Sequence, residues 1–211
     1  GAVGTSPELR GRGLQRQLMP RLLEQARPED LVFLFANEAV VDFYPRFGFR
    51  RKREHQFGLP LMAAPAAAPL RKLDLASADD RATLQRIAAR AQPVTERIGA
   101  ADYGTTVLFY WSNFYPDALR HAPEADAIFA VQQLGDTLHV HDVLAPALVD
   151  LVGHVPRLID APIRQLALGF SPDRYGLGAT PLGEYTESPL FVRGPHTLPP
   201  APFKFPVFAQ T

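Results

Sequence analysis

The segment Thr5–Gln15 combines residue types that could hold an anion. Gly11 and Gly13 stand directly before an amphipathic stretch. Glycine lets the backbone approach a ligand and take positive φ, and the first N–H groups of a helix have no partner inside it. The helix dipole adds partial positive charge at that end, so a pyrophosphate is a suitable ligand. Arg10 and Arg12 can add direct charge.

A second group of residues could supply a proton donor: Phe35-Ala36-Asn37-Glu38, followed by Phe43-Tyr44-Pro45-Arg46-Phe47-Gly48-Phe49. The phenol of Tyr44 has an ordinary pKa of about 10, so it is protonated at neutral pH and is a suitable general acid. An aromatic helix could equally bury such a tyrosine in a core with its hydroxyl satisfied. Asn37 suits a helix N-cap, and a cofactor contact would be additional.

Together the two segments resemble the cofactor-binding region of GNAT acetyltransferases, over roughly residues 3 to 58. The signature of that superfamily is Arg/Gln-x-x-Gly-x-Gly/Ala, preceded by a Pro-Glu pair. Pro7-Glu8, Arg10 and Gly13 match it, whereas Gln15 stands where Gly or Ala is usual. The spacing of the two segments together is more specific than a glycine-rich turn alone.

The resemblance implies that acetyl-CoA binds between two splayed parallel strands, one ending near Thr5 and one at residues 31–36. A neutral amine would attack the thioester directly, backbone N–H groups near Thr5 would polarise the carbonyl, and Tyr44 would protonate the leaving sulfur. The acceptor is expected to be a small amine, and no residue is nominated as its base. The expected cofactor contacts are Thr5, Leu9, Arg10, Gly11, Arg12, Gly13, Leu14, Gln15 and Asn37.

Periodicity predicts the elements that position these residues. A helix containing Pro20, which should kink it, follows the glycine turn. Residues 31–35 are typical of a strand covered on both faces. A further helix should run from its cap at Asn37 through Phe47 and end at Gly48 in the left-handed conformation. The apolar residues on one face of the first helix are Leu14, Leu18, Leu22 and Ala26.

The alanine- and proline-rich residues 61–70 predict a linker. It separates the acetyl-CoA-binding part, residues 1–60, from a second domain, residues 71–211. The expected fold class is α/β (α+β), a GNAT-like mixed twisted sheet with flanking helices followed by a smaller α+β domain. The second domain looks similar to the degenerate second acetyltransferase-like domains of larger GNAT proteins. No second acetyl-CoA is expected there, since Gly176-Leu177-Gly178 follows no clear strand.

The elements expected in the second domain follow from caps and apolar patterns. Ser77 and Asp80 form a capping box for a helix. Residues 127–133 and 137–143 should form a hairpin across 134–136. The inner face of the capped helix should hold Leu84, Ile87, Ala88 and Ala91. Further elements are a helix at 147–152, strands at 163–168, 190–193 and 205–209, and a solvated strand edge at Arg50–Arg53.

Two clusters in the second domain carry weaker signals. His139 and His141 share a strand face, with Asp142 on the other. Two histidines could hold a metal, but no third ligand is identifiable, so an exposed strand face is favoured and no metal site is predicted. An aromatic cluster could line a pocket, although a core or interface is favoured. Its members are Phe109, Tyr110, Trp111, Phe114 and Tyr115.

The totals exclude several classes of protein. Twenty-two basic residues balance 22 acidic ones, so nothing attracts the chain to nucleic acid or anionic lipid. The absence of cysteine excludes disulfides and thiolate zinc sites and fits a reducing cytoplasm. No apolar run approaches the roughly 20 residues that span a bilayer, and no secretory signal is visible. We therefore expect a cytoplasmic protein with no nucleic acid or membrane partner.

Several alternatives stay open. A complete GNAT domain has strands and helices before the phosphate loop, and about 58 residues are too few to hold a core alone. We expect the natural chain to begin upstream of Gly1; otherwise the second domain or another protomer of a homodimer would cover the open strand edge. The main hypothesis is an N-acetyltransferase, and the alternative is a catalytically silent acetyl-CoA-binding or scaffolding protein. An unrelated phosphate or nucleotide binder would need a magnesium site, for which we find no motif.

Overall fold

The computed structural model describes residues 4–195, 198, 200 and 202–210. The chain divides into two compact units, unit 1 with residues 1–54 and 185–198 and unit 2 with residues 55–184 and 199–210. The boundary between the units falls after Glu54, within strand β2 (Arg50–Ala63), and not in the alanine- and proline-rich residues 61–70. Residues 61–63 are thus strand, and only 64–70 are left to connect it to β3.

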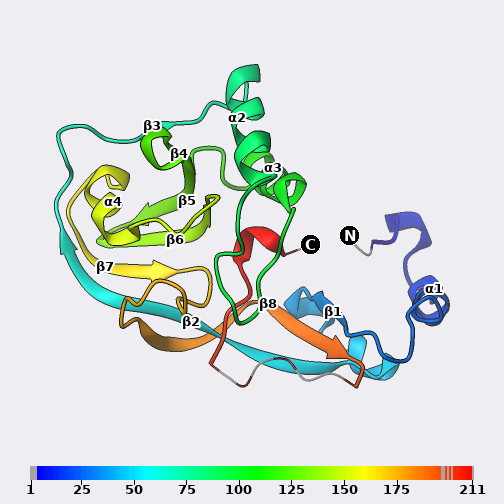
Figure 1. Cartoon of the computed structure of the whole chain (residues 1–211). Helices are drawn as coiled ribbons and strands as arrows, with labels where there is room; N and C mark the ends of the chain where they lie inside the picture. Colours follow the sequence, from blue (N-terminus) through cyan, green and yellow to red (C-terminus); the bar gives the residue numbers. More distant parts are fainter. Residues whose placement is uncertain (1–3, 196–197, 199, 201, 211) are drawn as a thin grey trace. The chain divides into compact units, whose positions relative to one another are not determined.

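The expected fold class is confirmed. The described strands form a mixed eight-stranded sheet in the order β1-β8-β2-β7-β6-β5-β4-β3, with flanking helices (Figure 1). The remaining strands are β1 (Val32–Phe35), β3 (Arg71–Lys72), β4 (Leu119–Ala122), β5 (Ala127–Leu134), β6 (Thr137–Leu144), β7 (Ile163–Leu168) and β8 (Thr180–Arg193). The helices are α1 (Leu14–Leu23), α2 (Ala78–Ala88), α3 (Gly104–Asn113) and α4 (Leu151–Leu158). Short 3-10 turns are η1 (Pro7–Leu9), η2 (Glu38–Val40), η3 (Tyr44–Phe47), η4 (Pro123–Ala125) and η5 (Val207–Ala209).

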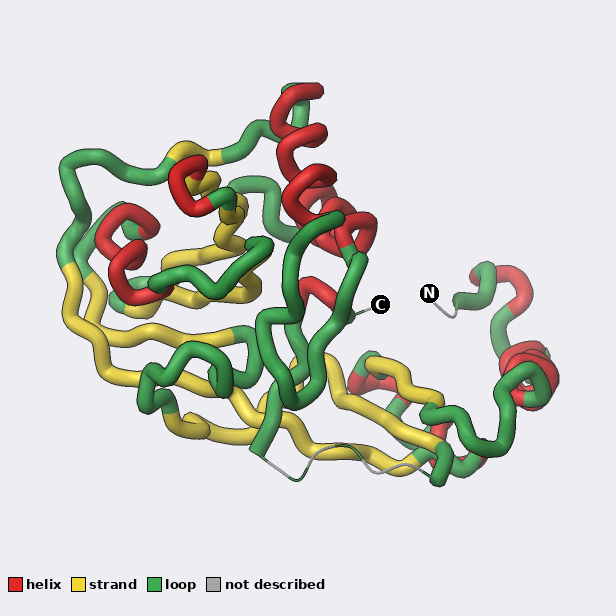
Figure 2. Tube along the Cα trace, viewed as in Figure 1, coloured by secondary structure: helices red, strands yellow, loops and turns green. Residues whose placement is uncertain are grey.

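Unit 1 has a small core around strand β1, which pairs antiparallel with β8. Residues 4–6 form no part of the predicted strand ending near Thr5, whose earlier residues 1–3 lie outside the described residues, and Figure 2 shows only loop and helix between residue 4 and β1. A strand needs a partner for its N–H and C=O groups, and no described segment pairs with these residues. The buried residues of the core are Met19, Ala36, Tyr44, Phe49 and Phe191.

The prediction that the strand at residues 31–35 is covered on both faces is wrong. β1 ends the strand order, and Phe33 is 44% exposed, so the strand is not covered on both faces. The predicted helical repeat is present in α1; three of its leucines face solvent, Leu23 packs against the core and Met19 is buried. Exposed large apolar groups in one stripe indicate a surface that takes part in contacts. The exposed leucines of α1 are Leu14, Leu18 and Leu22.

The predicted helix from Asn37 to Phe47 is replaced by the turns η2 and η3. Pro45 lacks an N–H group and its ring obstructs the preceding turn, so a continuous α-helix is disfavoured. Both ends were predicted correctly. The Asn37 side chain accepts a hydrogen bond from the Ala39 N–H at 2.8 Å, and Gly48 has the left-handed φ of 80°.

Unit 2 contains the larger core, and most of its strands were predicted. β5 and β6 form the expected hairpin, with Gly135 at φ 60° in the turn. β6 and β7 run parallel, connected through α4, as a parallel pair requires. Figure 1 shows α2 and α3 beside each other, consistent with their residue contacts. The exposed run at the start of β2 agrees with the predicted solvated strand edge.

Three elements of unit 2 differ from expectation. The helix predicted at 147–152 begins at Leu151, because the Asp150 side chain accepts from the Gly153 N–H at 2.9 Å and caps it there. Residues 205–209 contain the turn η5 in place of a strand, and the N–H of Val207 donates to the Gly169 carbonyl. The aromatic cluster lies largely on helix α3. This helix was not predicted, because its apolar residues lie on all sides and show no helical period. None of the helices in the described residues is long and apolar enough to cross a membrane.

Half of the α2 capping box is present, since the Ser77 N–H donates to the Asp74 carbonyl and not to the Asp80 side chain, and it adjoins an ion pair between the buried Asp80 and the exposed Arg71. Ser77 accepts from the Asp80 N–H at 3.3 Å, and Leu84, Ile87 and Ala88 are buried, while Ala91 lies beyond the helix. The Arg71 guanidinium donates to both oxygens of the Asp80 carboxylate at 2.7 Å. This pairing lowers the pKa of Asp80 to about 2.

Replacing Arg71 with methionine should lower the free energy of unfolding by about 1–3 kcal/mol, because the buried carboxylate loses its two charge-assisted bonds. A lowered folded-state pKa gives stability that is present above about pH 4 and lost as the pH falls toward about 2. Urea unfolding between pH 2 and 7 measures both effects. A variant that loses as much stability with acid as the parent protein would contradict the assignment.

Candidate anion-binding site

The glycine-rich segment forms an open turn before α1. Gly11 and Gly13 have φ of 76° and 71°, and Gly13 is the N-cap residue of the helix. No atom lies within 4 Å of a Cβ built on either glycine, so the space beside them is free. The turn therefore has the backbone conformation that its glycines predict, and it opens toward solvent.

The backbone donors of this turn are available to a ligand. The N–H groups of Leu9 and Arg10 bond to carbonyls of residues 6 and 7, inside η1 and its cap. Within the described part of the chain, the N–H groups of Gly11, Arg12 and Gly13 have no acceptor, and these three residues are exposed. Successive free N–H groups at a helix start form an anion-binding site.

The hollow at this turn measures about 360 Å³, and small-ligand sites typically measure roughly 300–1,000 Å³. Its lining contains two cationic side chains and no carboxylate. It brings together seven of the predicted cofactor contacts, whereas Arg12 and Asn37 do not line it. The lining residues are Thr5, Leu9, Arg10, Gly11, Gly13, Leu14, Gln15, Arg16 and Phe43.

Arg16 and Phe43 were not predicted from the sequence. Arg16 had a readable signal, since the first turn of α1 contains no acidic residue and a cation there is repelled by the helix dipole. A bound anion would offset this repulsion, so a basic residue at the start of α1 is compatible with an anion-binding site. Phe43 had no comparable signal, because its place beside the turn depends on tertiary packing.

Gln15, which departs from the GNAT signature, bonds to the start of the segment. Its Nε2 donates to the Gly4 carbonyl at 2.8 Å and to Thr5 Oγ1 at 2.9 Å. Arg10 Nε donates to the Thr5 carbonyl at 3.3 Å, which leaves its terminal nitrogens free to bind elsewhere. The longer side chain thus replaces close backbone packing with hydrogen bonds that hold residues 4 and 5.

Tyr44 lies in the core of unit 1 and does not line the hollow. Its ring contacts Phe43, Phe49 and Phe191, with centroid separations of 5.4, 6.1 and 5.6 Å. The side chain is 7% exposed, and burial raises the pKa of the phenol. The hydroxyl bonds to none of the described residues, yet it is not sealed within protein. Phe43, its neighbour in sequence, contacts the Tyr44 ring and also lines the hollow.

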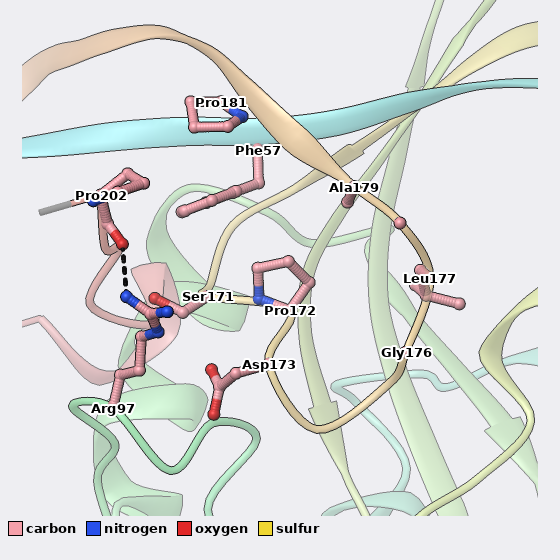
Figure 3. A pocket seen from close by; sticks show the side chains of 11 residues that line it. Phe57, Arg97, Ser171, Pro172, Asp173, Gly176, Leu177, Ala179, Pro181 and Pro202 are labelled. Carbon is pink, nitrogen blue, oxygen red and sulfur yellow. Dashed lines mark hydrogen bonds between the residues drawn. The ribbon is translucent and has the colours of Figure 1, made fainter.

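A second hollow, of about 320 Å³, lies in unit 2 beside the Gly176-Leu177-Gly178 segment (Figure 3). Arg97 borders it and donates to the Pro202 carbonyl at 3.0 Å. Asp173 is held by the Thr95 hydroxyl and the Glu96 N–H. The Arg97 guanidinium and the Asp173 carboxylate already form hydrogen bonds within the protein, and much of the remaining lining is apolar. This hollow therefore offers less to an anion than the turn of unit 1.

The histidine pair shows no sign of a metal centre. No group of three potential ligands occurs among the described residues. The His139 and His141 rings stack with centroids 6.2 Å apart, and His141 stacks on Phe208 at 5.6 Å. Burial and the neighbouring His139 lower the pKa of His141 to about 4, so its ring is neutral at physiological pH. The pair is better described as part of an aromatic stack than as an exposed strand face.

Comparison with known proteins gives one family match. Residues 1–51 match the sequence model of a family described as acetyltransferase (GNAT) domain. No curated protein matches the sequence significantly. This match covers the segment that holds the turn, α1 and Tyr44.

Three solved structures show the extent of similarity. A GCN5-related N-acetyltransferase from Kribbella flavida is 18% identical with a TM-score of 0.44, covering 92% of this chain and 51% of that one. A probable N-acyltransferase, a conserved protein of unknown function from Enterococcus faecalis V583, is 14% identical with a TM-score of 0.49, covering 92% and 53%. A GCN5-related N-acetyltransferase from Sphaerobacter thermophilus is 15% identical with a TM-score of 0.38, covering 89% and 70%. The chain thus spans about half the length of the first two.

Proposed function

We propose that unit 1 binds acetyl-CoA and takes part in transferring its acetyl group to a primary amine, because residues 1–51 match the model of a GNAT acetyltransferase family. The observation that carries this proposal is the set of free N–H groups from Gly11 to Gly13, in a turn whose two glycines line a hollow with two arginines and no carboxylate. A diphosphate has the charge and acceptor oxygens that such a site binds. The cytoplasm, where acetyl-CoA and amines meet, is the proposed location.

The proposed reaction needs one bond formed and one broken. The amine nitrogen attacks the thioester carbonyl carbon, the carbon–sulfur bond breaks, and Tyr44 gives its proton to the departing sulfur. The amine loses a proton to a base that we do not assign. Thr5, Leu9, Leu14 and Gln15 would contact the cofactor with the turn, while Arg12 would add charge and Asn37 would serve mainly as the cap of η2.

A catalytically silent acetyl-CoA-binding or scaffolding protein is the second candidate. It is favoured by the position of Tyr44, which packs in the unit 1 core and does not line the hollow. Calorimetric titration of the full chain with CoA, followed by thiol release from acetyl-CoA with a panel of amines, separates the two. Binding with turnover supports the enzyme, binding without turnover supports the silent protein, and failure to bind CoA rejects both.

Replacing Gly13 with valine should weaken CoA binding at least about tenfold. A β-branched residue at φ 71° costs about 1–2 kcal/mol, so the turn rearranges and its N–H groups lose their alignment. One lost charge-assisted hydrogen bond, about 1.5–3 kcal/mol, already corresponds to that change.

The matched control is Gly183→Val in β8, where a Cβ also has open space but φ is not left-handed. Its CoA affinity should equal that of the parent protein. Titration calorimetry measures both variants, with thermal unfolding as the check on folding. Unchanged CoA affinity in a folded Gly13 variant would mean that the turn does not hold the diphosphate.

A further inference from the structure

A hollow of about 230 Å³ in unit 2 contains a buried arginine with most of its hydrogen-bonding capacity unused. Arg120, on β4, is 7% exposed. Its Nη1 donates to the Asp117 carbonyl, and no carboxylate within the described residues forms an ion pair with it. A guanidinium has five N–H donors, and buried charges in proteins are normally paired.

Two donor nitrogens of Arg120 are unused and accessible. Nε and Nη2 have no acceptor among the described residues, yet neither is sealed within protein. Arg120 borders the hollow, so a ligand held there lies beside its side chain. Burial lowers the pKa of the guanidinium, which agrees with a charge held away from bulk water. An anionic ligand group would supply the missing acceptors.

The rest of the lining limits the chemistry of the ligand. Lys72 adds a second cation, whereas Asp117 and Asp160 add two carboxylates. The two carboxylates would repel a ligand that is purely anionic, and they offer acceptors to an ammonium group. Phe114, 61% exposed, presents an aromatic ring at the same hollow. The volume lies below that of drug-sized ligands.

We propose that this hollow binds a small zwitterion, an α-amino acid with an apolar or aromatic side chain. The ligand carboxylate would pair with Arg120 and Lys72, its ammonium with Asp117 or Asp160, and its side chain would lie on Phe114. The site lies wholly in unit 2 and is independent of the proposed acetyl-CoA site, so the failure of one leaves the other standing.

The test uses three ligands that differ by one charged group each. L-Phenylalanine carries both groups, 3-phenylpropionate lacks the ammonium, and phenethylamine lacks the carboxylate. Calorimetry on the full chain without CoA should show binding of phenylalanine, with each analogue weaker by at least about tenfold, the loss expected for one charge-assisted hydrogen bond. Equal affinity for all three, or no binding of phenylalanine at millimolar concentration, would overturn the proposal.

Variants then locate the binding. Arg120→Met should abolish phenylalanine binding, whereas Arg164→Met, which removes an exposed arginine of β7, should not change it. If Arg120→Met does not fold, as judged by thermal unfolding, Lys72→Met gives the same test at an exposed position and should weaken binding severalfold. Phenylalanine binding that is unchanged in a folded Arg120→Met or in Lys72→Met protein would place the ligand elsewhere and reject this site.

Discussion

Replacing Tyr44 with phenylalanine should lower the turnover number about 10²–10⁴-fold, the usual contribution of a positioned general acid. CoA affinity should not change, because the lining of the hollow includes Phe43 and not Tyr44. Stability should change little, since the phenol hydroxyl bonds to none of the described residues and the ring is kept. The variant therefore separates chemistry from binding and folding.

Tyr185→Phe is the matched control, since it also removes a phenol hydroxyl from unit 1. It should retain the turnover of the parent protein. Steady-state kinetics with acetyl-CoA and the best amine of the panel measures both variants, and calorimetry gives the CoA affinity. Equal turnover in the Tyr44 and Tyr185 variants would remove Tyr44 from the mechanism and leave its phenol as a core residue.

The parts of unit 1 that the sequence predicted well are the local ones. Gly13, Asn37 and Gly48 each have a backbone role set by their own chemistry, as helix start, cap and left-handed terminator. Such residues act through the chain beside them, so their pattern is readable without knowledge of distant contacts. The turn before α1 and the ends of the 37–48 segment followed from this alone.

The parts that were missed depend on which surfaces meet. Apolar period alone identified a face on α1, but Leu14, Leu18 and Leu22 are exposed and Met19 packs inward. A helical period in the sequence shows that a helix has an apolar face, whereas the burial of that face depends on which other elements pack against it. For the same reason the sequence could not predict that Phe43 would line the hollow while Tyr44 would not, or that Arg120 would be buried with no carboxylate in ion-pair contact.

The buried carboxylate of Asp142 should have a large effect on stability. Asp142, on β6, is fully buried and accepts hydrogen bonds from the Tyr103 hydroxyl at 2.8 Å and from the Val143 N–H at 2.8 Å. Burial disfavours the charged form and raises the pKa of Asp142 to about 7, while these two bonds act in the opposite direction. The ordinary pKa of an unfolded aspartate is about 3.9.

The shift makes the stability of unit 2 depend on pH. Since the pKa is higher in the folded state, the folded protein binds more protons between about pH 4 and 7. The contribution of Asp142 to stability is greatest below about pH 4 and falls as the pH rises to about 7, where the loss levels off. Three pKa units at 1.36 kcal/mol each give a loss of up to about 4 kcal/mol.

Asp142→Asn removes the titration but keeps a group of the same shape that can accept from Val143 and bond to the Tyr103 hydroxyl. Its free energy of unfolding should therefore exceed that of the parent protein by up to about 4 kcal/mol near pH 8, with a much smaller difference near pH 4. Tyr103→Phe should act in the opposite sense at neutral pH, losing about 1–3 kcal/mol, because the carboxylate loses a donor. Urea unfolding across this pH range measures all three variants, with the exposed Asp136→Asn as control. An Asp142→Asn protein that is less stable than its parent at pH 8 would contradict the prediction, because it would show that the charged carboxylate is better satisfied than its burial implies.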